Sequence, residues 1–184
     1  MSSKNRVRRL PPVCALVAVL RMLTGRLRLE SRYVGSIVVM EDGQRFRVFR
    51  HLSLSGNEER EQGAPASAIL VVRFKFARLS QALNRWLSLI PVPLIGGYPG
   101  FRQKLWMVHE ETGYWQGVYE WESAEAVREY RGSFVLRLMN RRAESESILY
   151  TVVEGMHLTD FIRQRTDDES WTLEQHHRSM GEEV

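Results

Sequence analysis

The chain has 184 residues, of which 43% are hydrophobic and 26% are charged. This is the composition of a globular domain with a sizeable core, and it excludes the disordered and fibrous classes. The single cysteine, Cys14, excludes an internal disulfide and favours a reducing compartment. The net charge of +4 is unevenly placed, because residues 1–32 hold eight lysines and arginines against one acidic residue, Glu30. The sequence therefore has a basic head and a mildly acidic body.

The basic head, residues 1–32, is predicted to be a helical segment. Pro11 and Pro12 can open a helix and Gly25 can close it. Its apolar positions recur at helical spacing, at Leu16, Leu20, Leu23 and Leu27. The apolar stretch 13–23 is too short to cross a bilayer, which needs about 20 residues. No small-residue cleavage site follows it, so a signal peptide is not favoured.

Two interpretations of this helix stay open. In the first, which we favour, it packs on its own domain. In the second it lies on a membrane, because Arg21, Arg26 and Arg28 could meet anionic lipid beside the apolar stretch. The second interpretation predicts a peripheral membrane contact through residues 1–28.

A β-hairpin is predicted over residues 33–54. Two strand-like runs flank Asp42-Gly43, and this dipeptide between such runs is the strongest short-range hairpin signal. An isolated hairpin is marginal in water, so this one must pack against another part of the protein. Residues 55–67, rich in glycine and glutamate, form a predicted linker.

The body, residues 68–163, is predicted to contain four strands and two helices, before a polar tail over residues 164–184. The strands are expected at 68–76, 101–109, 114–121 and 148–154. The first helix follows Ser80, carries Leu83, Trp86 and Ile90 on one apolar face and ends at Pro91. The second helix follows Ser123 and runs over 124–142. This β-α-β-β-α-β order is that of the ferredoxin-like fold, so we expect an α+β protein with an added N-terminal helix and hairpin.

The sheet of such a body is expected to expose one face. Right-handed crossovers place both helices on the same side, which leaves the opposite side in need of a partner. A regular turn at Glu110–Gly113 would pair Lys104 with Tyr119, Trp106 with Gly117 and Arg102 with Trp121. One face would then carry four aromatic residues and two cations, namely Trp106, Trp115, Tyr119, Trp121, Arg102 and Lys104. An apolar wall with a few polar groups is typical of a small-molecule site.

The alternative for these aromatic residues is a purely structural role. They would then pack beneath the two helices, while Leu105, Met107 and Val118 would point outward. A slip of one residue at the turn would also divide the set between the two faces.

Part of the body resembles the YdhR-type monooxygenases of the dimeric α/β-barrel superfamily. The resemblance covers about half of the chain and is carried by Pro99, Gly100, Phe101, Lys104, Trp106, Gly117, Tyr119, Trp121 and Tyr130. It implies a homodimer in which two ferredoxin-like units pack sheet to sheet, with a pocket between sheet and helices that Trp121 lines. It also implies cofactor-independent monooxygenation of a phenol or quinol. Many superfamily members carry a histidine on the second helix, which residues 128–134 lack, so neither haem nor another cofactor is expected.

Lys104 and Trp121 are the candidate catalytic residues, and the candidate substrate-binding residues are Arg102, Trp106, Trp115 and Tyr119. A protonated Lys104 or Arg102 would stabilise a phenolate. Burial would instead lower the pKa of Lys104 and make it a base. The sequence leaves both roles open, and a third in which the two cations are solvated on an edge strand and prevent aggregation.

The other sequence patterns do not predict a functional site. His176-His177 has no third ligand at suitable spacing, so no metal site is expected. Nothing in the sequence positions His157 or Asp160. RNA-recognition domains share the predicted order of elements, but strand 114–119 lacks their signature and the body is not basic, so no nucleic-acid partner is expected.

The alternative function is a non-catalytic protein that binds a lipophilic ligand or associates peripherally with a membrane. The expected location is the cytoplasm, either free or at the inner face of the membrane.

Overall fold

The computed structural model of this chain describes residues 10–55, 67–76, 80–144 and 146–166. This part of the chain is built on one antiparallel sheet of seven strands. The strands are β1 (Leu27–Glu30), β2 (Ile37–Val39), β3 (Arg45–Leu54), β4 (Ala68–Lys75), β5 (Phe101–Val108), β6 (Tyr114–Trp121) and β7 (Leu149–Glu154). Their order is β1-β3-β5-β6-β4-β7, and β2 pairs with β3. The predicted α+β class is confirmed.

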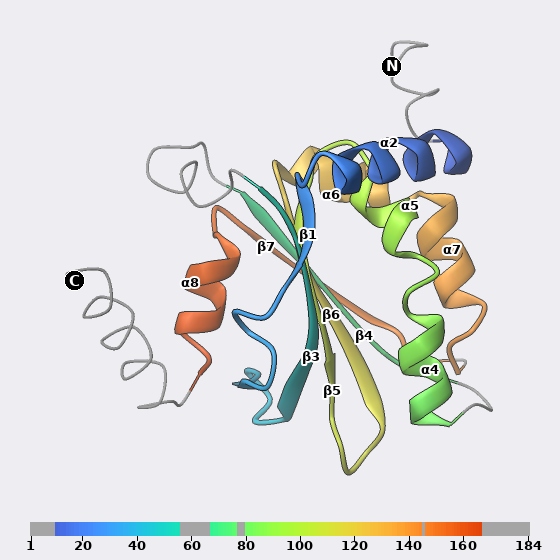
Figure 1. Ribbon diagram of the computed structural model, residues 1–184. Coiled ribbons are helices and arrows are strands. Elements are labelled where there is room, and N and C mark those ends of the chain that lie inside the picture. The colour runs from blue at the N-terminus through green and yellow to red at the C-terminus, as the bar shows by residue number, and fades with distance from the viewer. Residues whose placement is uncertain (1–9, 56–66, 77–79, 145, 167–184) are drawn as a thin grey trace, which may run out of the picture.

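The helices lie on both sides of this sheet. They are α2 (Pro11–Leu23), α4 (Gln81–Leu87), α5 (Val92–Gly96), α6 (Ala124–Arg131), α7 (Phe134–Asn140) and α8 (Leu158–Arg163). Figure 1 shows α4, α5, α6 and α7 on one side of the sheet and α8 on the other, with α2 beside α5. None of the helices in the described ranges is both long enough and apolar enough to cross a bilayer.

The predicted hairpin is present and extends the sheet of the body. Val39 pairs with Arg45 across the Asp42-Gly43 turn, where Gly43 takes the positive φ of +77° that glycine tolerates. Strand β3 continues beyond β2 and pairs with β5. This pairing supplies the support that an isolated hairpin lacks.

The basic head contains the predicted helix and then a strand that the sequence did not predict. Helix α2 opens with Pro11 and Pro12 in its first turn, as expected. The helical spacing suggested that Leu27 continues the helix, and this is wrong. The chain reverses at Gly25, with φ +67°, and residues 27–30 form β1 against the far end of β3.

Helix α4 begins as predicted but faces the opposite way from its apolar pattern. The Ser80 hydroxyl caps it by accepting from Leu83 N. Its apolar residues Leu83 and Trp86 are exposed, whereas Asn84 and Ser88 are buried. The polar side of α4 faces inward because two arginines of the body bind it. Arg142 donates to Asn84 Oδ1 at 3.2 Å, and Arg50 donates to Ser88 Oγ.

The second predicted helix, residues 124–142, is two helices. Ser123 caps α6 as expected, by accepting from Ala126 N. Gly132 ends α6, and Ser133 then adopts an extended ψ of 158° and caps α7 by accepting from Leu136 N. Two helices, each capped by a serine, therefore stand where one continuous helix was expected.

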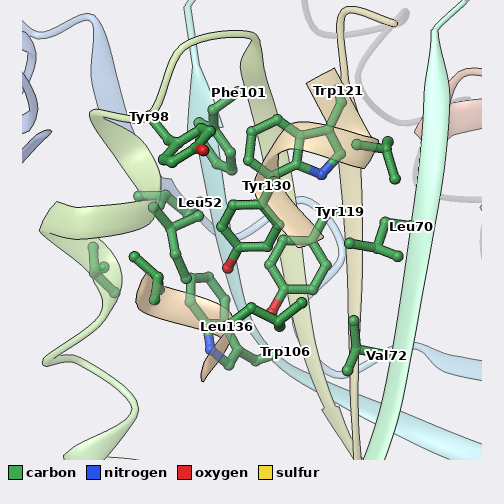
Figure 2. Close-up of a cluster of buried hydrophobic side chains, with 14 of the residues drawn as sticks. Leu52, Leu70, Val72, Tyr98, Phe101, Trp106, Tyr119, Trp121, Tyr130 and Leu136 are labelled. Carbon is green, nitrogen blue, oxygen red and sulfur yellow. The ribbon is translucent and has the colours of Figure 1, made fainter. Parts of the chain in front are cut away.

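The predicted aromatic wall lies beneath the helices, which corrects its expected place on an uncovered face. Trp106, Trp115, Tyr119 and Trp121 belong to the core between the sheet and helices α2, α5, α6 and α7. Figure 2 shows Trp106, Tyr119 and Trp121 grouped with Tyr130 in this layer.

The opposite face of the sheet is not bare either. Its residues Leu105, Met107 and Val118 are fully buried. Tyr33 and the α8 residues Leu158, Phe161 and Ile162 pack in the same cluster. The chain thus covers with its own segments the face for which the sequence had suggested a partner.

Gly97 gives a direct test of how α2 packs against α5. A Cβ atom at Gly97 would lie 1.8 Å from the backbone oxygen of Cys14, so any side chain must push α2 away. We expect Gly97→Ala to lower the free energy of unfolding by about 1–3 kcal/mol, measured by chemical denaturation. Gly132→Ala is the matched control, because its Cβ would meet nothing closer than 3.6 Å. Equal effects of both substitutions would contradict this contact.

Candidate functional site

The register of β5 and β6 brings the central site residues together. Lys104 pairs with Tyr119, and Trp106 pairs with Gly117, as the sequence predicted. A Cβ atom at Gly117 would lie 2.7 Å from the ring of Tyr119. The absence of a side chain at Gly117 therefore lets the Tyr119 ring lie along the strand beside Lys104.

Lys104 is buried in an aromatic environment. It is 1% exposed, and its Nζ lies 4.0 Å from the ring centre of Trp106 and 4.1 Å from that of Tyr119. Within the described ranges, Nζ has no hydrogen-bond acceptor. A buried ammonium without an acceptor is unfavourable, since it loses its hydration without replacement.

This environment favours the neutral amine. Burial holds the pKa of Lys104 well below its ordinary value of 10.5, and the positive charge of Arg50 lowers that pKa further. The two aromatic faces act in the opposite direction, because each attracts a cation by about 2 kcal/mol when desolvated. Desolvation of a fully buried charge is the larger effect. Of the roles that the sequence left open for Lys104, the base is the one that fits.

A small cavity adjoins the amine. Its volume is about 30 Å³, and its lining residues are Phe74, Phe76, Ser88, Pro91, Lys104, Trp106, Trp115, Gln116, Gly117, Tyr119, Met139 and Arg142. A water molecule needs roughly 10–15 Å³ of such space. The Lys104 cavity, as we call this space and its lining, can therefore hold about two waters in the present conformation.

Four of the six predicted site residues line this cavity, and two do not. Lys104, Trp106, Trp115 and Tyr119 are in the lining. Trp121 lies behind Tyr119 in the aromatic core, with its ring centre 4.5 Å from that of Tyr130. Trp121 therefore touches the Lys104 cavity only through its neighbours.

One buried polar atom near the cavity lacks a hydrogen-bond partner. Among the residues described, nothing pairs with Trp121 Nε1. Burial also raises the pKa of Tyr119 and of Tyr130, so both phenols stay neutral. Figure 2 shows these rings packed side by side. Unpaired buried polar groups cost stability, and they are uncommon in native cores.

Arg50 lies close to two lining residues of the cavity, Ser88 and Trp106, and the sequence did not predict it there. Arg50 from β3 donates to Ser88 Oγ and to the backbone oxygen of Arg85, the latter at 3.2 Å. Its guanidinium also lies 5.8 Å from the ring centre of Trp106. The pairing of β3 with β5 is irregular between Val48 and Arg50, and this irregularity turns Arg50 toward the helices.

Arg102 is not part of this site. The predicted pairing of Arg102 with Trp121 is wrong, because Phe101 occupies that register position and the pairing is irregular between Phe101 and Gln103. The guanidinium of Arg102 instead lies near the buried carboxylate of Glu120, at 3.5 Å from Oε1. One irregularity in β5 thus separates the two predicted cations.

Glu120 is the centre of a second buried cluster. It is 0% exposed, and its carboxylate accepts from Ser67 Oγ at 2.7 Å, Gln103 Nε2 at 2.6 Å and Leu158 N at 3.1 Å. His157 Nδ1 lies 3.0 Å from the same carboxylate. No sequence pattern positioned His157, but as the N-cap residue of α8 it is held against β6.

The Glu120 cluster has the composition of a hydrolytic triad but not its geometry. A triad needs the carboxylate at one imidazole nitrogen and the nucleophilic hydroxyl at the other. Here Ser67 Oγ and Glu120 Oε1 both meet Nδ1 of His157, at 2.9 and 3.0 Å. The cluster therefore joins β4, β5, β6 and α8 structurally. No group of three potential metal ligands occurs in the described ranges.

No protein-family model matches the chain, and no curated protein matches it.

The depressed pKa of Lys104 predicts a specific pH dependence of stability. The unfolded chain binds the lysine proton more readily than the folded one, so wild-type stability falls as pH decreases from 10.5 toward the native pKa. The slope is at most about 1.4 kcal/mol per pH unit. Lys104→Met removes this loss, so its stability advantage over wild type should be largest near neutral pH and shrink toward pH 10.5.

Urea denaturation of both proteins at several pH values measures this difference. Lys75→Met, at a partly exposed lysine of β4, controls for the loss of a lysine as such. A constant difference between wild type and Lys104→Met at every pH would mean that Lys104 keeps its ordinary pKa.

The Glu120 cluster predicts a large loss of stability when its charge is removed. Glu120→Gln removes the buried negative charge beside the guanidinium of Arg102, which should lower the free energy of unfolding by about 3–5 kcal/mol. Glu125→Gln is the control, because the Glu125–Arg128 pair is exposed, with both side chains 65% accessible. Thermal and chemical denaturation compare the two variants, and similar stabilities would contradict a structural role for Glu120.

Proposed function

We propose that this chain binds a phenol-like aromatic molecule in the Lys104 cavity of a ferredoxin-like body. The ferredoxin-like assignment is supported by the order β5-β6-β4-β7 within the sheet. It is also supported by the connections, since α4 and α5 join β4 to β5, and α6 and α7 join β6 to β7. The likeness to YdhR-type monooxygenases stays a prediction based on the residues named above.

The observation that carries the proposal is the buried amine without an acceptor. A neutral Lys104 beside a phenol can take its proton, which converts two isolated buried groups into an ion pair. At 4 Å and an effective dielectric constant of about 20, such a pair gains about 4 kcal/mol. The rings of Trp106, Trp115 and Tyr119 provide the apolar walls that an aromatic ligand needs.

The ligand must enlarge the cavity, because about 30 Å³ is less than an aromatic ring occupies. Met139 from α7 is the wall residue best suited to move, since methionine has three rotatable bonds and fills irregular spaces. Its sulfur lies 3.9 Å from the Tyr119 hydroxyl. Rotation of the Met139 side chain would join the cavity to the space beside that hydroxyl.

The reaction that we propose uses the phenolate as the reductant of dioxygen. Lys104 takes the phenol proton, and the phenolate transfers an electron to O₂, after which carbon and oxygen combine. One oxygen atom stays in the product as the second carbonyl of a quinone, and the other leaves as water with two hydrogens of the phenol. In this scheme Lys104 is the proton acceptor, while Trp121 positions Tyr119 from behind.

The homodimer stays a prediction. Its argument from a bare sheet face no longer holds, because Tyr33 and α8 cover that face within the same chain. The cytoplasmic location and the absence of a nucleic-acid partner also stay predictions.

Binding of 4-nitrophenol tests the proposal, because its anion absorbs visible light and its neutral form does not. We expect the bound probe to show the anion spectrum at a pH where the free probe is mainly neutral, since Lys104 takes the proton. Lys104→Met should abolish this spectral change, while Lys75→Met should keep it. Absence of any binding to the wild-type protein overturns the proposed function.

Oxygen uptake in the presence of a quinol separates catalysis from simple binding. Lys104→Met should lower the rate of uptake to the rate without protein, and Lys75→Met should leave it unchanged. Binding without oxygen uptake would support the alternative, a non-catalytic protein for lipophilic ligands, and would reject the monooxygenase reaction.

A further inference from the structure

Helix α2 packs on the protein through a narrow face. Its buried residues are Cys14 and Ala18, and the backbone of Cys14 rests against Gly97 at the end of α5. On the same side, Arg21 donates to the backbone oxygen of Gly96 at 2.6 Å. Arg21 is the single charged residue of α2, and it therefore points toward the protein and donates to a carbonyl group.

The outer face of α2 is apolar and exposed. We define this face by Leu16, Val19, Leu20 and Leu23, of which Leu16 is 60% and Leu23 is 78% exposed. A surface helix normally turns its polar residues to water and its apolar residues to the core. In α2 the buried residues Cys14 and Ala18 and the outer face are both apolar, and an exposed apolar patch of this kind marks an interaction site.

Cationic residues lie at the C-terminal end of this apolar face, and further cations precede the helix in the sequence. Arg26 and Arg28 follow α2 and are exposed. The sequence before the helix contributes Lys4, Arg6, Arg8 and Arg9, whose placement lies outside the described residues. The chain contains no acidic residue before Glu30.

We propose that α2 docks this protein on the surface of an anionic lipid bilayer, with the outer face of α2 lying in the plane of the membrane. Thirteen residues of helix extend over about 20 Å, which is shorter than the roughly 30 Å hydrocarbon core, so α2 lies on the bilayer and does not cross it. The leucines enter the headgroup boundary, while the flanking cations meet anionic headgroups.

The charge pattern favours lipid over a second copy of the chain. Two α2 helices packed through their outer faces would bring two cationic heads together, and like charges at an interface oppose association. An anionic surface removes that repulsion. This inference is independent of the proposed ligand, because α2 contributes no residue to the lining of the Lys104 cavity.

Co-sedimentation of the full chain with vesicles tests the proposal. One vesicle preparation contains phosphatidylcholine alone, and the other contains an equal mixture of phosphatidylcholine and phosphatidylglycerol. We expect binding to the anionic vesicles that is at least about tenfold tighter than to the neutral ones, and weaker in high salt.

The double substitution Leu16→Glu with Leu23→Glu should weaken binding to the anionic vesicles by about tenfold or more. Both side chains are exposed, so folding should not change, and circular dichroism checks this. Trp86→Glu on α4 is the matched control, because Trp86 is 74% exposed and apolar but lies on another helix. Its binding should equal that of wild type.

A second variant, Arg26→Gln with Arg28→Gln, should reduce the preference for anionic vesicles without removing an apolar contact. Three results would overturn the proposal. These are no binding to anionic vesicles, equal binding by wild type and the leucine variant, or a dimer in light scattering that the leucine variant alone dissociates while vesicle binding is absent.

Discussion

The pairing of β5 with β6 determines where the buried polar groups of this protein lie. In its regular part, Lys104 faces the helices beside Trp106. Beyond the irregularity at Phe101, the side chains of Arg102 and Gln103 meet the carboxylate of Glu120 on the other side of the sheet. A sheet has only two faces, so normal alternation separates Lys104 from Glu120, and the irregularity between Phe101 and Gln103 adds Arg102 to the Glu120 side. Both clusters depend on the same strand geometry.

The two clusters differ in how their buried charges are satisfied. Glu120 has partners for both of its oxygens, which makes its burial compatible with a stable core. Within the described ranges, Lys104 Nζ contacts two aromatic faces, and the nearby Trp121 Nε1 is unpaired. A ligand with one polar group in an apolar ring would compensate such a site, whereas the Glu120 cluster has no need of one.

Sequence reasoning recovered the features that depend on local signals. The caps at Ser80 and Ser123, the Asp42-Gly43 hairpin and the pairing of Lys104 with Tyr119 all follow from short patterns. It failed where partners are distant in sequence. The apolar face of α4 turns outward because Arg50 and Arg142 attract its polar face, and no local pattern contains that information. The role of α8 was missed for the same reason, since its contacts lie on strands far earlier in the chain. The irregularity that moved Arg102 has no signature in the alternation of β5.

The single thiol, that of Cys14, lies where α2 contacts the rest of the protein. Cys14 is 1% exposed at the junction of α2 with α5, and burial raises its pKa. A thiol reacts through its thiolate and only where reagents reach it. Chemical modification of Cys14 thus requires α2 to separate from α5. The rate at which a thiol reagent modifies Cys14 therefore measures how often α2 separates from α5. This measurement needs no introduced label.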